Sequence, residues 1–300
     1  RDSSDGKMSS MLHPGKAIYV RISDGLGNQM FQYAAGRALA LQNQTELVLE
    51  PIPEFFKWLN PSRRFALPYF ELSSHVHISY PPLSSRILGK ARSLKPDVLT
   101  RKECNAYQFQ NDIAELKPPA RIEGFFQSSN YFKNVPQTIL HKEFSLKKEL
   151  SRRAKELKEK IVRKENSICL HMRLADYKNS EIFFSLRENY YQAALGDILR
   201  QLPSRPTVWV FSNGNREEVT ALCARSGIPS AEIQTDQRIP EWELLHVMSA
   251  CQHHVIANST FSWWAAWLKG NQGITVMPKR WFQEPSWEVS GLRFPGWSQI

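Results

Sequence analysis

The chain has 300 residues, of which 42% are hydrophobic and 11% aromatic, and its formal net charge is +10. This composition supports a sizeable core, in one large domain or two of ordinary size, and argues against general disorder. No stretch reaches the roughly 18 apolar residues of a membrane span, and the polar residues 1–16 lack the apolar core of a signal peptide. We therefore expect a soluble, cytoplasmic protein in which residues 1–16 are a disordered terminus or a cloning remnant.

The first predicted elements form a β-α-β unit. An apolar run predicts a strand over residues 17–22, a glycine-containing turn follows, and helical spacing predicts a helix over 29–42 before a strand at 46–49. Residues 51–118 lose this regularity because proline, serine and scattered aromatic residues interrupt the pattern. We expect irregular structure there, with at most one helix, and a binding surface.

A further strand is predicted over residues 122–126, and a strongly basic segment, residues 141–164, follows it. Apolar residues keep a helical spacing in this segment, so we predict one helix that links the two halves of the chain. Its mixed charges are typical of a solvated face, and no aromatic residues interleave with the basic ones. We expect no nucleic-acid partner, and leave open an anionic small molecule or a weak peripheral membrane contact.

From residue 165 onward, short apolar runs alternate with amphipathic segments of helix length. Strands are predicted at 167–170, 207–211, 254–257 and 273–277, and helices at 189–201, 215–226, 241–251 and 262–269. This alternation is typical of parallel β-α units. The predicted fold class is therefore α/β, with helices flanking parallel sheets.

Patterns typical of metal and redox centres are missing from the sequence. The four cysteines lie far apart without a C-x-x-C pair, which fits a reducing cytoplasm. No D-x-D pair occurs, and His246, His253 and His254 lack the spacing of ligands with a partner acid. We expect no metal site, so positive side chains have to neutralise any bound phosphate.

Polar residues follow three strands of the second half. They are His171 to Tyr177, Ser212 to Gly214, and Asn258 to Ser262. Ligands of parallel sheets bind beyond the carboxyl ends of the strands, so these residues are expected to share one crevice. The last segment precedes a helix, which predicts an anion site, with a plain helix cap facing water as the alternative. Arg173 adds forked donors that match phosphate oxygens, unless a surface salt bridge engages it.

A second glycine-containing segment, Asp24 to Gln29, follows the first strand and opens a helix. A dinucleotide fingerprint therefore has to be considered, but Met30 stands where its third glycine belongs, and only Glu50 approaches the place of its acid. We favour a different interpretation, in which Gly25 and Gly27 let a ligand approach the backbone.

Five segments in order form a set: Gly25 to Gln32, Gly124 to Ser128, His171-x-Arg173-x-x-Asp176-Tyr177, Phe211-Ser212, and Asn258 to Trp264. This set resembles the motifs of the alpha-1,2-fucosyltransferases, glycosyltransferase family 11, over about residues 18–280. The chain departs from the family pattern at two positions. Leu174 stands where a second Arg is usual, and Asn213 where an acid is usual.

The resemblance implies a two-lobed, Rossmann-like fold of the GT-B type. It implies an acceptor-side α/β domain over residues 17–155 and a nucleotide-sugar-binding domain over residues 156–300. The implied activity is metal-independent, inverting transfer of L-fucose from GDP-beta-L-fucose to the 2-hydroxyl of a terminal galactose on an oligosaccharide acceptor, without a cofactor. Transfer in another linkage or from another GDP-sugar, and a non-catalytic nucleotide- or glycan-binding protein, are the alternatives.

The resemblance also implies roles for particular residues. The donor-binding candidates are Gly25, Gly27, Asn28, Gln29, Arg173, Ser212, Asn258, Ser259, Thr260 and Ser262. The catalytic candidates are Arg173, His171 and Asp176. Arg173 is expected to stabilise the leaving diphosphate, and Asp176 to activate the acceptor hydroxyl or orient His171, or else to have a structural role in its turn. The acceptor is expected to touch residues 51–118.

Overall fold

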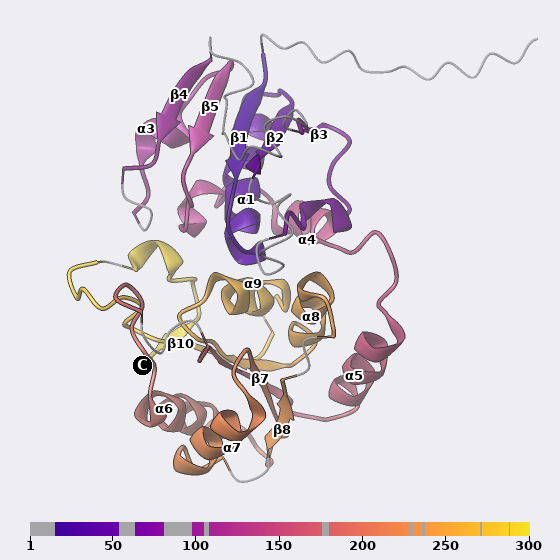
Figure 1. Cartoon of the computed structure of the whole chain (residues 1–300), viewed down its shortest axis with the longest axis vertical. Helices are drawn as coiled ribbons and strands as arrows, with labels where there is room; N and C mark the ends of the chain where they lie inside the picture. Colours follow the sequence, from indigo (N-terminus) through magenta and orange to yellow (C-terminus); the bar gives the residue numbers. More distant parts are fainter. Residues whose placement is uncertain are drawn as a thin grey trace, which may run out of the picture.

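The computed structural model describes residues 16–53, 64–80, 98–104, 108–175, 180–228, 231–235, 238–270, 272–287 and 289–300. Its strands form two sheets, with strand orders β3-β2-β1-β5-β4 and β11-β10-β9-β6-β7-β8. Each sheet and its helices form a lobe, and Figure 1 shows the first lobe above the second, with α9 between the two sheets. All neighbouring strands in the two sheets are parallel, which confirms the predicted α/β class.

The predicted β-α-β unit forms the centre of the first lobe. It consists of β1 (Ile18–Ile22), α1 (Leu26–Gln42) and β2 (Leu47–Pro51). A Cβ added at Gly36 of α1 would lie 2.2 Å from Val20 Cγ2, so the helix backbone packs directly on the sheet. The predicted strand at 122–126 is β5 (Ala120–Glu123), which pairs with β1.

The expectation of irregular structure over residues 51–118 is wrong in part. This region supplies both edge strands of the first sheet, β3 (Val76–Ile78) and β4 (Leu99–Lys102), and two short helices, η3 (Leu67–Tyr69) and α3 (Asn111–Ala114). The strands have three and four residues and none of them is fully buried, so they lack the apolar alternation by which strands are recognised. Residues 54–63, 81–97 and 105–107 lie outside the described part of the chain.

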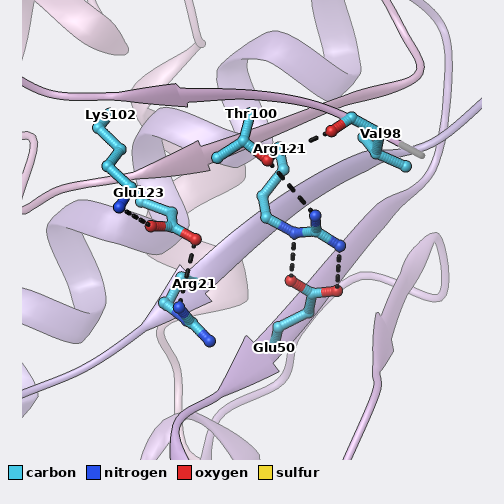
Figure 2. A network of polar contacts seen from close by, with 7 residues as sticks. All are labelled: Arg21, Glu50, Val98, Thr100, Lys102, Arg121 and Glu123. Carbon is cyan, nitrogen blue, oxygen red and sulfur yellow. Dashed lines mark hydrogen bonds and ion pairs between the residues drawn. The ribbon is translucent and has the colours of Figure 1, made fainter. Parts of the chain in front are cut away.

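One face of the first sheet carries an ion-pair network (Figure 2). Arg121 donates from Nε to Glu50 Oε2 at 2.8 Å and from Nη2 to Glu50 Oε1 at 3.1 Å, and both side chains are buried. Glu123, the next residue on the same face of β5, pairs more openly with Arg21 and Lys102. Removal of either partner would leave the other charge buried without compensation, which is strongly destabilising.

The single helix predicted over residues 141–164 is in fact two. Helix α4 (Gln137–Glu143) and helix α5 (Arg152–Val162) are separated by residues 144–151. Phe144, the first residue of the break, is fully buried, and its ring centroid lies 5.2 Å from that of Trp264. The Ser151 hydroxyl then accepts a hydrogen bond from the Ala154 N–H and caps α5.

The second lobe follows the predicted alternation. Its matched elements are β6 (Ile168–Met172), α6 (Glu188–Leu199), β7 (Val208–Ser212), α7 (Arg216–Arg225), α8 (Glu241–Met248), β9 (His253–Val255), α9 (Thr260–Leu268) and β10 (Thr275–Met277). The edge strands β8 (Ala231–Gln234) and β11 (Ser298–Gln299) were not predicted. Within the described residues, no helix combines the length and the apolar character needed to cross a membrane.

The two lobes share a hydrophobic core. The rings of Trp263 and Trp264 on α9 lie 4.8 and 5.0 Å from the ring of Phe31 on α1, and all three side chains are fully buried. The Trp263 indole N–H donates to the Leu292 carbonyl at 2.7 Å, in the short helix η5 (Ser290–Leu292). Aromatic packing therefore fixes α1 against α9, the two helices that begin at the candidate site.

Candidate active site

The turn after β1 meets the start of α9 at Gly27. A Cβ added at Gly27 would lie 2.5 Å from the Phe261 nitrogen and 2.5 Å from the Thr260 carbonyl carbon. Both contacts are to backbone, which cannot yield as a flexible side chain would. The absence of a side chain at Gly27 therefore lets the first turns of α1 and α9 approach each other, whereas Gly25 has no atom within 4 Å of the same position.

Asn28 joins three segments at this approach. Its Oδ1 atom accepts a hydrogen bond from the Thr260 hydroxyl at 2.9 Å and another from Gln127 Nε2 at 3.0 Å. Gln127 follows β5, so the amide of Asn28 links two strand ends of the first lobe to α9 of the second. The structure thus brings the predicted residues Gly27, Asn28 and Thr260 together.

Gln29 lies beneath this turn and is fully buried. Its Nε2 donates to the carbonyls of Asp24 at 2.7 Å and Arg64 at 2.8 Å, and its Oε1 accepts from the Ala66 N–H at 2.9 Å. The side-chain amide therefore clamps the β1–α1 turn to residues 64–66. Its contacts are structural, and a direct contact with the donor stays a prediction.

Arg173 and Ser259 form the cationic side of the site. Arg173 follows β6, and its Nη1 donates to the Ser259 hydroxyl at 3.4 Å. Ser259 is the N-cap residue of α9, and its side chain makes no capping hydrogen bond. The first N–H groups of a helix have no intrahelical acceptor and carry the positive end of its dipole. The guanidinium and the helix start together offer a site for an anion.

Asn258 and Ser262 hold the start of α9 from inside. Asn258 Nδ2 donates to the carbonyls of Phe184 and Trp281, both at 2.8 Å, and the Ser262 hydroxyl donates to the Ser259 carbonyl at 3.2 Å. Both side chains are buried. In this structure they position the backbone that an anion would contact.

The turns after β6 and β7 are hydrogen-bonded to each other. Asn213 Oδ1 accepts from the Leu174 N–H at 3.0 Å, and the Ser212 hydroxyl accepts from the Gly214 N–H at 3.0 Å. The Leu174 side chain packs against the apolar core of the second lobe. The neutral amide at 213 thus fixes the backbone of residue 174, whose side chain supplies no charge to the site.

His171 and Asp176 are the remaining catalytic candidates. His171 lies at the end of β6, its side chain is buried, and its ring centroid is 6.3 Å from that of Phe261 on α9. Asp176 falls within residues 176–179, outside the described part of the chain. Its proposed role as a base therefore stays a prediction.

Sequence reasoning missed Glu241, the first residue of α8. Burial raises the pKa of its carboxyl to about 7, and the positive charges of Arg173 and Arg64 act in the opposite direction. Its Oε1 atom is buried without a hydrogen-bond partner among the described residues. An acid in the first turn of a helix is common because it complements the dipole, so the sequence held no signal of this environment.

A second partly buried carboxyl, that of Glu103, supports the loop that follows β5. Its Oε2 accepts from the N–H groups of Phe125 and Phe126 at 2.8 and 2.9 Å, and Phe126 has a positive φ of 52°. Burial raises the pKa of Glu103 to about 7, which these hydrogen bonds partly offset. Because Gln127 comes next in this loop, Glu103 helps to place the amide that bonds to Asn28.

Within the described residues, no group of three or more His, Cys, Asp or Glu side chains has the arrangement of a metal site. The three histidines considered from the sequence have other surroundings. His246 Nε2 contacts the Phe144 carbonyl at 2.9 Å, and His254 Nε2 contacts the Met248 carbonyl at 3.1 Å. His253 Nδ1 accepts from the Ile274 N–H at 3.0 Å.

Two proteins of Escherichia coli resemble the chain along most of its length. The alpha-1,2-colitosyltransferase is 28% identical over 284 residues, which cover 89% of this chain and 92% of that protein. The O-antigen biosynthesis glycosyltransferase WbnK is 28% identical over 296 residues, which cover 88% and 95% of the two chains.

Solved structures of the same fold extend the comparison. The NodZ alpha-1,6-fucosyltransferase, co-crystallised with GDP, matches with a TM-score of 0.51 at 14% identity, over 84% of this chain and 92% of that chain. FUT1 of Arabidopsis thaliana, in complex with GDP, matches with a TM-score of 0.50 at 12% identity, over 93% and 72%. These likenesses confirm the predicted two-lobed fold of the GT-B type.

The match to a family model is the most specific of the comparisons. The model of glycosyl transferase family 11 matches residues 91–300, which include the turns after β6, β7 and β9 and the whole of α9. This range is well over half of the chain. The chain belongs to glycosyltransferase family 11.

Proposed function

We propose that this glycosyltransferase moves L-fucose from GDP-beta-L-fucose to the 2-hydroxyl of a terminal galactose, with inversion and without a metal ion. The observation that carries the proposal is the contact between Arg173 and Ser259 at the start of α9. A guanidinium beside helix N–H groups that have no intrahelical acceptor suits the diphosphate of a leaving nucleotide. Such groups stabilise the charge that develops as the bond to the sugar breaks.

The comparisons support parts of this proposal. Similarity to an alpha-1,2-colitosyltransferase supports an alpha-1,2 linkage. It also makes a colitose donor the first alternative to GDP-fucose. The NodZ and FUT1 structures hold GDP, which makes GDP the first nucleotide to test. We propose that the acceptor touches residues 51–118, which also supply the edge strands β3 and β4 of the first sheet.

The proposed reaction is a direct displacement. The acceptor oxygen attacks the anomeric carbon on the face opposite the diphosphate, and a new C–O bond forms. The bond from the anomeric carbon to the diphosphate breaks, and GDP leaves with the electron pair. Arg173 and the N–H groups at the start of α9 stabilise the negative charge on the leaving diphosphate. The proton of the acceptor hydroxyl passes to a base, for which we propose Asp176, assisted by His171.

A panel of donors in EDTA tests this proposal. The chain is incubated with GDP-fucose, the corresponding colitose donor or GDP-mannose, and with a terminal beta-galactoside, and the product linkage is determined by NMR. The proposal predicts an alpha-1,2-linked fucosyl product. A colitosyl product would show that the donor is a colitose nucleotide and not GDP-fucose, and a different linkage would show that another acceptor hydroxyl is used. GDP binding without any product would favour a non-catalytic binder.

The basic helix α5 offers positive charge to an anionic surface. Arg152 and Arg163 of this helix region have largely exposed side chains. We include a weak peripheral contact of a cytoplasmic enzyme with an anionic membrane surface. Co-sedimentation with vesicles that contain anionic lipid tests it, and equal binding to neutral vesicles would contradict it.

A further inference from the structure

Arg64 is joined to the glycine turn of the candidate site through the side chain of Gln29. It precedes η3 in the first lobe, and its side chain is exposed. Gln29 holds the backbone on both sides of Phe65, because its Nε2 donates to the Arg64 carbonyl at 2.8 Å and its Oε1 accepts from the Ala66 N–H at 2.9 Å. The same Nε2 atom also bonds the Asp24 carbonyl of the glycine turn. The backbone of Arg64 is therefore fixed while its side chain stays accessible.

The segment that carries Arg64 also docks on the second lobe. The ring of Tyr69, at the end of η3, stacks on Trp242 of α8 with centroids 3.6 Å apart and an interplanar angle of 6°. Further along α8, His246 lies with its ring centroid 6.1 Å from that of Phe70. Residues 64–70 are thus held against the start of α8, where Glu241 lies.

Glu241 connects Arg64 to Arg173. Both guanidinium groups lie near enough to its carboxylate to stabilise the charged form, against the effect of burial. Arg64 comes from the first lobe and Arg173 from the second, and Arg173 also contacts Ser259 at the start of α9. In the first lobe, Gln29 bonds Arg64 and the adjacent Asn28 bonds Thr260, so Arg64 and Arg173 both belong to segments that meet at the start of α9.

The charge of the proposed donor calls for more than one cation. A diphosphate carries about two negative charges, and in metal-independent transfer these have to be met by protein groups. Leu174, next to Arg173, has no charge to supply, and its side chain packs against the core of the second lobe. Within the described part of the chain, Arg64 is the cation that acts on the same carboxylate as Arg173.

We propose that Arg64 is a second donor-binding residue, which binds the diphosphate from the first lobe together with Arg173 from the second. Gln29 fixes its backbone against the glycine turn, and its exposed side chain remains available to a ligand. This inference rests on the proposed nucleotide-sugar function. A consequence is that donor binding ties the two lobes together through one anion.

Calorimetric titration in EDTA tests the inference with GDP and GMP as probes. The variants are Arg64→Ala, Arg64→Lys and the control Arg152→Ala, which removes the same charge from α5, where Arg152 pairs only with Glu156 among its described contacts. Arg64→Ala is expected to weaken GDP binding by roughly tenfold to a hundredfold, and GMP binding less, because a charged hydrogen bond to the second phosphate is lost. Arg64→Lys should recover part of the loss, since it keeps the charge without the fork.

The role of Arg64 and the proposed GDP-sugar donor can fail separately. If the unaltered chain binds GDP and Arg64→Ala binds it equally well, with an unchanged melting curve, the role of Arg64 is refuted while the donor stands. An equal loss for GDP and GMP would also refute it, because the effect would not be specific to the diphosphate. If the unaltered chain binds no GDP at all, the proposed donor fails, and this inference fails with it.

Discussion

The Thr260 hydroxyl donates a hydrogen bond of 2.9 Å to Asn28 Oδ1, across 232 positions of the chain. Asn28 lies in the first turn of α1 in the first lobe, and Thr260 is the first residue of α9 in the second. The bond therefore closes the point where the two lobes meet, beside the residues that we propose for the donor.

Gly27→Ala is expected to damage both stability and transfer. The added Cβ would lie 2.5 Å from backbone atoms of residues 260 and 261, so one helix has to shift. We expect a loss of about 1–3 kcal/mol in the free energy of unfolding. Denaturant titration measures it, with Gly25→Ala as the control, because Gly25 has open space at this position. Equal effects of the two substitutions would show that the close approach at Gly27 does not matter.

Arg173→Ala is expected to lower kcat/KM roughly a hundredfold to a thousandfold, because it removes a charge from the leaving diphosphate. GDP affinity should fall as well. Arg216→Ala is a suitable control in the same lobe, since Arg216 contacts the Ile233 carbonyl on the exposed side of α7. Steady-state kinetics and GDP titration together check the prediction, and an Arg173→Ala variant with normal GDP affinity and turnover would refute the assignment.

Asp176→Asn separates catalysis from binding. If Asp176 accepts the proton of the acceptor, the amide variant should lose roughly a hundredfold or more in kcat while its affinity for GDP stays the same. Kinetics at saturating donor measure the first quantity and calorimetry the second. Unchanged turnover would leave Asp176 with a structural role only.

The two acids of Figure 2 should differ strongly in their contribution to stability. Glu50→Gln leaves the buried Arg121 without its counter-charge, so we expect a loss of roughly 3 kcal/mol in the free energy of unfolding. Glu123→Gln affects contacts at 3.3 and 3.6 Å with more exposed partners, and should cost less than about 1 kcal/mol. Similar values for both would contradict the importance of burial.

Glu103 predicts a pH dependence of stability. Burial raises its pKa from 4.5 to about 7, so between these values the folded chain keeps a proton that the unfolded chain has released. Its contribution is therefore present below pH 4.5 and is lost as the pH rises to 7, with a size on the order of 3 kcal/mol.

The variant Glu103→Gln cannot titrate, yet its amide oxygen is able to accept the two N–H bonds of the loop. The difference between the unfolding free energies at pH 5 and pH 8 should therefore shrink in this variant. The exposed Glu115 gives the control Glu115→Gln, for which we expect no change in this difference. The assignment is contradicted if both variants behave like the unaltered chain.

The sequence predicted those parts of the fold that carry their own pattern. The β-α-β unit around α1 and the alternation after residue 165 have apolar periods long enough to recognise. Strands β3, β4, β8 and β11 have two to four residues and are not fully buried, so only pairing with a neighbour defines them. The break between α4 and α5 depends on the burial of Phe144 against another segment, which no local pattern reveals.

In the candidate site, too, some residues were predictable from local sequence patterns and others only come together on folding. Arg173 was recognisable because it directly follows β6, and Gly27 because it lies in the glycine-containing segment between β1 and α1, at the strand ends where parallel sheets bind ligands. Arg64 and Glu241 lie on separate segments and come together only in the folded chain. The contacts of Gln29 with Arg64 and Ala66 also depend on folding, since these residues are 35 and 37 positions away.

The central claim is acceptor-dependent transfer from a GDP-sugar without a metal ion. The most direct measurement is GDP release from GDP-fucose in EDTA, with and without a terminal beta-galactoside such as lactose. The proposed function predicts release that requires the acceptor and that EDTA does not reduce. Saturable GDP binding without release from any GDP-sugar and acceptor in the panel would contradict it, and would indicate a protein that binds the nucleotide without transferring the sugar.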